Sequence, residues 1–283
     1  MKKVLVFGGT GNVGRKVLQE LKQHDYEVTV VLRSPEKLHL VSQWIDHYFV
    51  ADIREERELS YVCKGQEIVI STLGKSVSVN DKDKATFMDV DYGGNKNIVK
   101  ASLQNNISKF VYLSAIHSEH YQHLQYFKAH HDFSELLKNS GIDYSIIKVP
   151  AIFSAFLDVL DLAKKGKLVT LGEGQCTTNP IYEGDVAEVI VKAITSPFFI
   201  MEAGGSKLYT RKQINDIIQQ CVNPKKKCPN IPVFLVKMLL PCIKFVDKNM
   251  YDKFAFFLEV TQHDVIAPMI GTALFEDYIK DKV

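Results

Sequence analysis

The chain of 283 residues has a formal net charge of +2 with its basic residues scattered, so its charge gives no indication of a nucleic-acid partner. Its five cysteines include no Cys-x-x-Cys pair, which predicts neither a metal site nor a disulfide framework, but free thiols in a reducing, cytoplasmic environment. No stretch approaches the roughly 20 apolar residues of a membrane span, and none resembles a secretion signal.

A glycine-rich turn near the N-terminus is the most informative stretch. The apolar run at residues 4–7 predicts a strand, and the spacing of Val17, Leu18 and Leu21 predicts a helix after the turn. Glycines at this spacing allow a sharp turn, a close approach of the backbone to a pyrophosphate and tight packing of helix on sheet. A purely structural turn is the alternative. We predict a dinucleotide site formed by Gly8, Gly9, Thr10, Gly11, Asn12, Val13 and Gly14.

Arg33 directly follows the second predicted strand, residues 26–32. In a dinucleotide-binding fold the end of this strand faces the adenosine ribose, where an acidic residue would bind the free 2′-hydroxyl of NAD. A guanidinium instead matches a 2′-phosphate through paired hydrogen bonds. Arg33 therefore favours NADP (NADPH) as the cofactor, with NAD as the alternative. A surface arginine beside a loop is the simpler interpretation of the same residue.

The next two predicted strands, residues 47–50 and 67–70, also end in residues suited to this cofactor. Asp52 and Ile53 follow the first of them, where a carboxylate would face the adenine amino group. Asp52 would also serve as the N-cap of a helix at residues 54–63. Ser71, Thr72 and Leu73 follow the second strand, and small residues there leave room for the cofactor. We predict that all five contribute to cofactor binding.

Strands and helices alternate from residue 3 to 150, with further strands at 110–113 and 144–147 and helices at 84–105 and 122–139. This alternation predicts an α/β fold: a Rossmann-type, doubly wound parallel sheet with ligands at the carboxyl ends of its strands. We assign residues 1–150 to this NAD(P)-binding core, with 180–196 packed on it. Residues 151–179 and 197–283 form a small, mostly helical substrate lobe. Within the lobe, residues 231–246 predict an amphipathic helix that covers a pocket or forms an oligomer contact.

These motifs together resemble the atypical and extended short-chain dehydrogenases/reductases, in particular their NmrA-like, NAD(P)H-binding members. The resemblance rests on the glycine turn, Arg33, Asp52 and the segments 110–114, 140–150 and 181–187. It runs from residue 1 to about 220. It implies a Rossmann fold and an NAD(P) cofactor, with Pro150 among the residues at the cofactor.

The resemblance also implies an active site, from which this sequence departs. The superfamily pairs a serine after the fifth strand with Tyr-x-x-x-Lys on the next helix. The tyrosine protonates the substrate, and the lysine holds the nicotinamide ribose and lowers the tyrosine pKa. Ser114 and Lys128 match the serine and the lysine, but Leu124 stands where the tyrosine is expected. Tyr121 and Tyr126 flank this position, but neither has the required spacing from Lys128.

Histidines near Ser114 offer a substitute acid, because imidazole titrates near neutral pH. His117 lies just beyond the fifth predicted strand and is our candidate. The other histidines fit solvent-exposed or helix-capping roles better and form no metal motif: His120, His123, His130 and His131.

Two functions follow from the sequence. The first is an NADP-dependent oxidoreductase acting on a small, apolar organic substrate, with Ser114, Lys128 and His117 as catalytic residues. The second is a non-catalytic, NADP(H)-sensing regulator of the NmrA type, which Leu124 favours. A sugar-nucleotide or isoprenoid enzyme is less consistent, because those chemistries generally use the missing tyrosine. The chain is expected to be a monomer or a homodimer.

Several apolar residues of the chain are candidates to line a substrate pocket, although packing in the core is the simpler interpretation. They are Phe153, Phe156, Leu157, Phe198, Phe199, Phe234, Phe254, Phe256 and Phe257.

Overall fold

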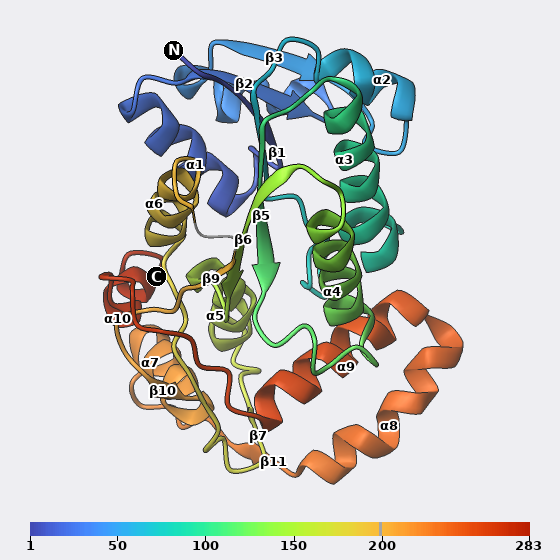
Figure 1. Ribbon diagram of the computed structural model, residues 1–283. Coiled ribbons are helices and arrows are strands. Elements are labelled where there is room, and N and C mark those ends of the chain that lie inside the picture. Colours follow the sequence, from blue (N-terminus) through green and yellow to red (C-terminus); the bar gives the residue numbers. More distant parts are fainter. Residues whose placement is uncertain (198–199) are drawn as a thin grey trace. The chain divides into compact units, whose positions relative to one another are not determined.

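The computed structural model describes residues 1–197 and 200–283 (Figure 1). They form two compact units of three segments each. Unit 1 comprises Met1–Lys75, Ala85–Lys148 and Val186–Glu202, and unit 2 comprises Ser76–Lys84, Val149–Asp185 and Ala203–Val283. Phe198 and Phe199, two of the pocket candidates, lie outside the described residues.

Unit 1 is built on a seven-stranded parallel sheet, which confirms the predicted Rossmann-type, doubly wound fold. Its central strands are runs of buried Val, Leu, Ile and Phe, as expected where helices cover both faces. The strands adjoin in the order β3 (His47–Val50), β2 (Glu27–Leu32), β1 (Lys3–Phe7), β4 (Ile68–Ser71), β5 (Lys109–Ala115), β6 (Asp143–Val149) and β9 (Ile200–Glu202). The order reverses between β1 and β4, and ligands bind such sheets at the carboxyl ends beside this point.

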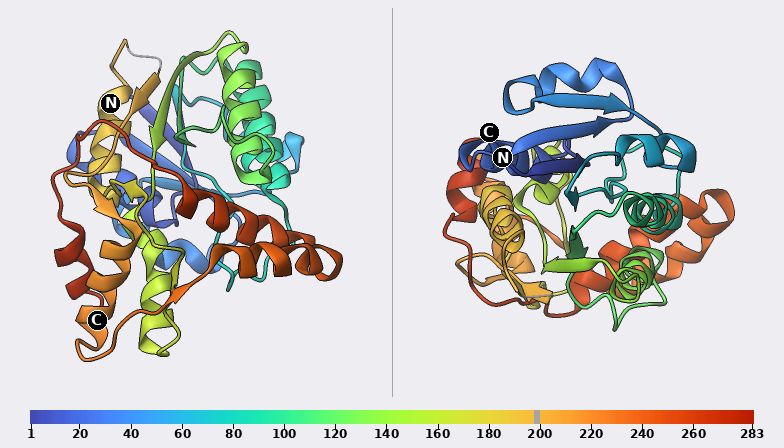
Figure 2. Two further views of the ribbon diagram at one scale, coloured as in Figure 1. Left: turned by 90° about the horizontal axis from the view of Figure 1, so that it is seen from below. Right: turned by 45° about the horizontal axis from the view of Figure 1, so that its top comes forward.

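Helices cover both faces of this sheet (Figures 1 and 2). One face carries α1 (Asn12–Gln23) and α6 (Glu183–Ala193), and the other carries α2 (Glu56–Val62), α3 (Asn95–Gln104) and α4 (Gln125–Lys138). Helix α1 buries Val17, Leu18 and Leu21, the apolar stripe read from the sequence. Under α2, α3 and α4, the core includes Leu59, Ile98 and Phe133.

Some elements differ from the sequence predictions. Instead of one helix over residues 84–105, a π-helical turn η3 (Met88–Gly94) precedes α3. Two adjacent glycines, Gly93 and Gly94, lie at this junction and weaken a regular helix. Two 3₁₀ helices, η1 (Pro35–Leu40) and η2 (Ser42–Trp44), follow Arg33. Strand β9 was not predicted, because three residues are too few to give a periodic pattern.

Unit 2 is mostly helical. An aromatic cluster around Phe153, Tyr209 and Phe275 forms its core, and Phe156 and Leu157 pack against this cluster. Thr210 caps α7 with a capping box, as its position in the sequence predicts. The other elements are η4 (Phe153–Phe156), α5 (Leu157–Lys164), β7 (Thr170–Leu171), β8 (Thr177–Thr178), β10 (Tyr209–Thr210), α7 (Arg211–Val222), β11 (Asn230–Ile231), α8 (Val233–Val246), α9 (Lys248–Gln262) and α10 (Phe275–Lys280).

The remaining pocket candidates divide between two helices of unit 2. Phe234 is exposed on α8, whereas Phe254, Phe256 and Phe257 are half-buried on α9. In the described part of the chain, no helix combines the length and the apolar character needed to cross a membrane. No cluster of metal-ligating side chains occurs among the described residues either.

Candidate cofactor and active site

The glycine turn after β1 is fixed by backbone packing. Gly8 has a φ of +81°, and the Gly11 N–H donates to the Gly8 carbonyl at 3.0 Å. A Cβ on Gly8 would lie 2.7 Å from the Thr72 backbone after β4, and one on Gly14 would lie 2.1 Å from the Gly8 oxygen. Gly8 therefore requires glycine for its conformation and for close approach, whereas Gly14 requires it for close approach alone.

The turn presents the open N-terminus of α1 at the switch point of the sheet. Gly11 is the N-cap residue, no side chain among the described residues caps the helix, and its first turn has no acidic residue. Gly11 and Asn12 are exposed. The first N–H groups of a helix lack intrahelical acceptors and, with the helix dipole, attract anions. A Cβ on Gly11 would meet only the Gly8 oxygen, at 3.3 Å. The outer side of the turn is therefore open enough for a pyrophosphate.

Basic side chains gather beyond β2 and β3. Arg33 follows β2 and is exposed. Asp52, beyond β3, accepts hydrogen bonds from Arg54 Nε at 3.0 Å and Arg54 Nη2 at 2.5 Å. The side-chain hydrogen bond from Arg54 lowers the pKa of Asp52, and the charge of Arg33 adds to the effect. Sequence reasoning missed Arg54, although it stands two residues after Asp52. The predicted capping role of Asp52 was wrong, because Glu55 is the N-cap of α2.

The other residues predicted at the cofactor mostly support the turn. The buried Ser71 hydroxyl donates to Asn95 Oδ1 at 2.5 Å. The Thr72 N–H and hydroxyl both donate to the Phe7 carbonyl, at 3.0 and 3.2 Å. The Ile53 carbonyl accepts a hydrogen bond from the Asn97 side chain at 3.0 Å. Leu73 packs against the unit 1 core. Pro150 follows β6 and belongs to unit 2.

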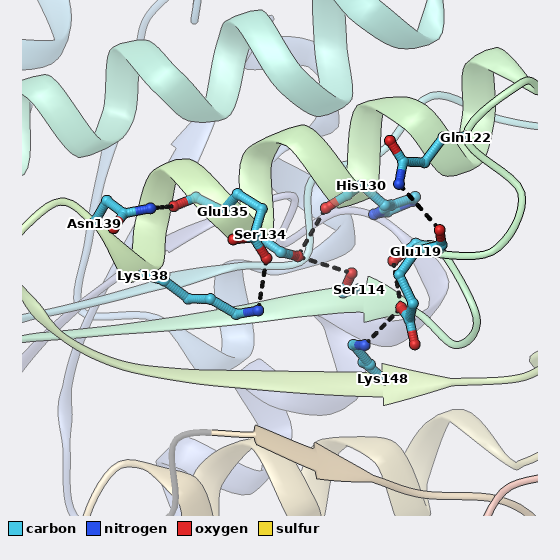
Figure 3. A network of polar contacts seen from close by, with 10 residues as sticks. Ser114, Glu119, Gln122, His130, Ser134, Glu135, Lys138, Asn139 and Lys148 are labelled. Carbon is cyan, nitrogen blue, oxygen red and sulfur yellow. Dashed lines mark hydrogen bonds and ion pairs between the residues drawn. The ribbon is translucent and has the colours of Figure 1, made fainter.

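The three predicted catalytic residues have separate partners. Ser114 is buried at the end of β5, with its hydroxyl 3.4 Å from that of Ser134 on α4 (Figure 3). Lys128 donates to Asp132 one turn further along α4, at 2.7 Å. His117 has a φ of +60° and its ring lies edge-on to His120. Burial lowers the pKa of His117, and the neighbouring His120 lowers it further. At neutral pH His117 is therefore mostly uncharged.

A buried chain of polar groups runs behind Ser114. The Tyr112 hydroxyl lies 2.6 Å from His130 Nδ1, and His130 Nε2 lies 3.5 Å from Asp91 Oδ1. Asp91 Oδ2 accepts the backbone N–H of Lys75 at 3.0 Å. All three side chains are at least nine-tenths buried. Among the described residues, Asp91 Oδ1 has no hydrogen-bond partner, and His130 Nε2 lies 3.5 Å from it.

The protonation of this chain is set by burial. Burial raises the pKa of Asp91 to about 8 and lowers that of His130 to about 4, because both charged forms lose their hydration. Burial also raises the pKa of Tyr112 well above its usual range, and the Asp91 charge adds to this rise. Both shifts favour the uncharged forms of the Asp91–His130 pair. Asp91 lies on the π-helical turn η3, an irregularity that is frequent at functional sites.

His130 is the residue that sequence reasoning misjudged most clearly. It was assigned a solvent-exposed or capping role, yet only 6% of it is exposed. One signal was available: Tyr126 precedes His130 by four residues, a Tyr-x-x-x-His spacing in the helix where the superfamily has Tyr-x-x-x-Lys. The two rings meet edge-on with centroids 4.7 Å apart. Burial, with the Asp91 charge, raises the pKa of Tyr126, so this phenol stays protonated.

A second polar pair lies beyond the carboxyl end of β5. Lys148 on β6 is buried and donates to Glu119 Oε2 at 2.9 Å (Figure 3). Burial opposes ionisation of Glu119, but the hydrogen bond and charge of Lys148 outweigh it and lower the pKa of that carboxyl. This ion pair lies on the same edge of the sheet as Ser114.

Comparison with known proteins decides the family. A family described as NAD(P)H-binding matches residues 8–197, well over half of the chain. The chain belongs to this NAD(P)H-binding family. The matched segment begins at the glycine turn and ends just after α6. The match confirms the expected membership of the atypical short-chain dehydrogenase/reductase superfamily.

Individual relatives of this NAD(P)H-binding protein are distant. The photosystem II assembly factor Ycf39 of Trieres chinensis is 21% identical over 89% of this chain and 80% of its own length. The chloroplastic divinyl chlorophyllide a 8-vinyl-reductase of Cucumis sativus is 25% identical over 87% of this chain and 63% of its own. The NADPH-dependent quinone oxidoreductase QOR2 of Escherichia coli, solved with NADPH, shares the fold with a TM-score of 0.70 at 15% identity, over 99% of both chains.

Proposed function

We propose that this protein is an NADPH-dependent oxidoreductase that reduces a small, apolar organic substrate. The observation that carries the proposal is the glycine turn, which leaves the N-terminus of α1 open at the sheet's switch point. Unit 1 would bind the cofactor, and unit 2 would supply the substrate lobe. A cytoplasmic location and a monomeric or homodimeric state accompany the proposal as predictions.

NADP is proposed over NAD because the end of β2 carries a basic residue where an NAD enzyme needs an acidic one. Arg33 would bind the 2′-phosphate, and Arg54, which neutralises Asp52, adds positive charge nearby. The backbone from Gly8 to Gly14 would receive the pyrophosphate.

The chemistry divides between cofactor and protein. Bound NADPH supplies a hydride. The protein must orient the substrate and provide one proton. We assign the proton supply to the chain Asp91–His130–Tyr112, which ends next to Ser114. In this arrangement Ser114 meets the substrate oxygen or carbon, while His130 and Asp91 hold and position the proton. The protonated Tyr126 phenol adds a hydrogen-bond donor to the same cluster.

The relatives support a reductase without naming the substrate. One of them is named as a vinyl reductase and another as a quinone oxidoreductase. An apolar, conjugated substrate would be consistent with the similarity to both the vinyl reductase and the quinone oxidoreductase. The second candidate is the non-catalytic, NADP(H)-sensing regulator of the NmrA type. It is favoured by Leu124 and by the similarity to an assembly factor.

One experiment separates the two candidates. Purified protein is mixed with NADPH and a panel of aldehydes, ketones, quinones and enones, and the absorbance of the reduced nicotinamide is followed. The reductase proposal predicts substrate-dependent loss of this absorbance with at least one class. Turnover should fall by roughly 10²-fold in Ser114→Ala, the size of a typical acid–base contribution. Tight NADPH binding without turnover of any compound would instead establish the regulator.

A further inference from the structure

Helix α8 has an apolar surface that faces solvent. The structure describes all 14 residues of α8, and none of them is buried. The sequence VFLVKMLLPCIKFV contains two lysines and no acidic residue; every other position is apolar. The most exposed side chains are Phe245 at 92%, Val246 at 88% and Phe234 at 66%. An apolar surface of this kind marks an interaction site when its residues are contiguous.

The exposed residues are contiguous around the helix axis. At about 100° per residue, Phe234, Met238 and Phe245 form one stripe. A second stripe lies directly beside it. We define the α8 apolar face as both stripes together: Phe234, Leu235, Met238, Leu239, Phe245 and Val246, all of them exposed.

The two sides that flank this face differ. Lys237 and Lys244 lie along one margin of it. The half-buried residues of α8 lie on the remaining side: Val233, Val236, Leu240 and Ile243. Helix α8 packs against α9 to form a hairpin (Figure 1), and Lys244 Nζ lies 5.3 Å from the centre of the Tyr251 ring on α9.

The dimensions of α8 exclude a membrane span but fit a position in the membrane surface. A helix of 14 residues is about 21 Å long, shorter than the roughly 30 Å hydrocarbon core of a bilayer. Pro241 interrupts its hydrogen bonding as well. An apolar face with a basic margin is typical of helices that lie in the headgroup region, parallel to the membrane.

We propose that the α8 apolar face docks this protein on an anionic lipid surface, with Lys237 and Lys244 next to the headgroups. The charge of α8 argues for lipid over a second copy of the chain. A two-fold contact brings the same patch of both copies together. Helix α8 carries no acidic residue that could pair with Lys237 and Lys244 across such a contact, whereas anionic headgroups neutralise both lysines.

Vesicle co-sedimentation tests the proposal. The wild-type chain is expected to pellet with vesicles of phosphatidylcholine and phosphatidylglycerol in a ratio of 7:3, and roughly tenfold less with pure phosphatidylcholine. The double variant Met238→Asp/Phe245→Asp should bind the anionic vesicles at least tenfold more weakly. The double variant Lys237→Glu/Lys244→Glu should bind the anionic vesicles no more strongly than the wild-type chain binds pure phosphatidylcholine.

Matched variants control for charge. Leu162→Asp/Leu208→Asp adds the same charge at exposed apolar positions elsewhere in unit 2 and should bind like wild type. Lys64→Glu/Lys192→Glu makes the same charge change as the Lys237→Glu/Lys244→Glu variant, but at exposed lysines outside α8, and should also bind like wild type. Circular dichroism confirms that each variant is folded. Absence of wild-type binding to both vesicles overturns the proposal, as does equal binding by the Met238→Asp/Phe245→Asp variant. A dimer seen by light scattering and lost in that variant, without vesicle binding, would assign the face to a second copy.

Discussion

The arginine at position 33 stands at the end of β2, where its charge is felt by Asp52. If it binds the 2′-phosphate, Arg33→Ala should weaken NADPH binding by roughly 10- to 100-fold, the size of a lost charge-assisted hydrogen bond. NADH binding should change less than about twofold. Calorimetric titration with both nucleotides measures this difference. Arg57→Ala, an exposed arginine on α2, should leave both affinities unchanged. Equal losses for both nucleotides in Arg33→Ala would show that Arg33 does not contact the phosphate.

Asp91 offers a test by pH. Burial raises its pKa to about 8, whereas the unfolded carboxyl titrates near 3.8. The folded protein therefore holds a proton that the unfolded chain releases, and the stability due to Asp91 is lost as pH rises from about 4 towards 8. The free-energy difference between wild type and Asp91→Asn should shift against wild type by about 1.4 kcal/mol per pH unit in this window.

Urea denaturation at pH 5, 6 and 7 measures this difference. His130, whose own lowered pKa acts in the opposite direction, is present in both proteins. Asp89→Asn is the matched control, because hydrogen bonds from Thr86 lower the pKa of Asp89 and keep it ionised throughout this range. A constant difference for Asp91→Asn would mean that Asp91 is ionised in the folded protein.

The residues predicted from sequence depend on local geometry, whereas those that were missed depend on contacts between distant segments. The glycine turn after β1 and the position of Arg33 after β2 were predictable because each depends on a short stretch of sequence, and their roles at the cofactor stay predictions. Asp91 and His130 come from η3 and α4, and they form a pair only after both pack on β5. Their altered pKa values come from burial, which a single helix in isolation does not provide.

Two glycines in the strand–turn–helix element around the glycine turn allow effects on stability and effects on NADPH binding to be measured separately. Gly14→Ala places a Cβ 2.1 Å from the Gly8 oxygen and should cost roughly 1–3 kcal/mol of stability or more, as overpacking does. Gly11→Ala places its Cβ 3.3 Å from the same oxygen and in front of the helix N-terminus. It should preserve the fold while weakening NADPH binding at least tenfold.

Thermal unfolding and nucleotide titration of the two variants measure these effects. Gly141→Ala, at a positive-φ glycine with open surroundings away from the turn, is the control for binding and should leave NADPH affinity unchanged. Unchanged NADPH affinity in a folded Gly11→Ala protein would contradict the proposed pyrophosphate position.

Long helices and buried strands were the elements most readily predicted, and irregular ones were missed. The alternation of apolar strands with amphipathic helices is strong from β1 to β6, so the sheet followed from it. The π-helical turn η3 carries no periodicity of its own. Gly94 allows it to approach Ile53, where a Cβ would lie 2.4 Å from Ile53 Cδ1. Such contacts between distant segments decide local geometry, and local sequence does not report them.

Over the whole molecule, cofactor binding should stabilise the two units unequally. At 100 times its dissociation constant, NADPH adds about 2.7 kcal/mol to the stability of whatever it binds. Hydrogen exchange with and without NADPH should therefore show new protection at the glycine turn and in α1. The amides of α7 serve as the internal control and should change little. Protection concentrated in unit 2 would contradict the assignment of the cofactor to unit 1.

The late position of β9 has a consequence for how the protein is made. Strand β6 ends at Val149, but its outer neighbour β9 begins at Ile200, about fifty residues later. At ~5–20 residues per second, a ribosome needs roughly 3–10 s to add that segment. During this interval the newly made sheet has β6 as an open edge, and unpaired edges recruit other chains. Expression fragments that stop near residue 150 keep this edge permanently and should aggregate, whereas the full-length chain, in which β9 pairs with β6, should remain in solution.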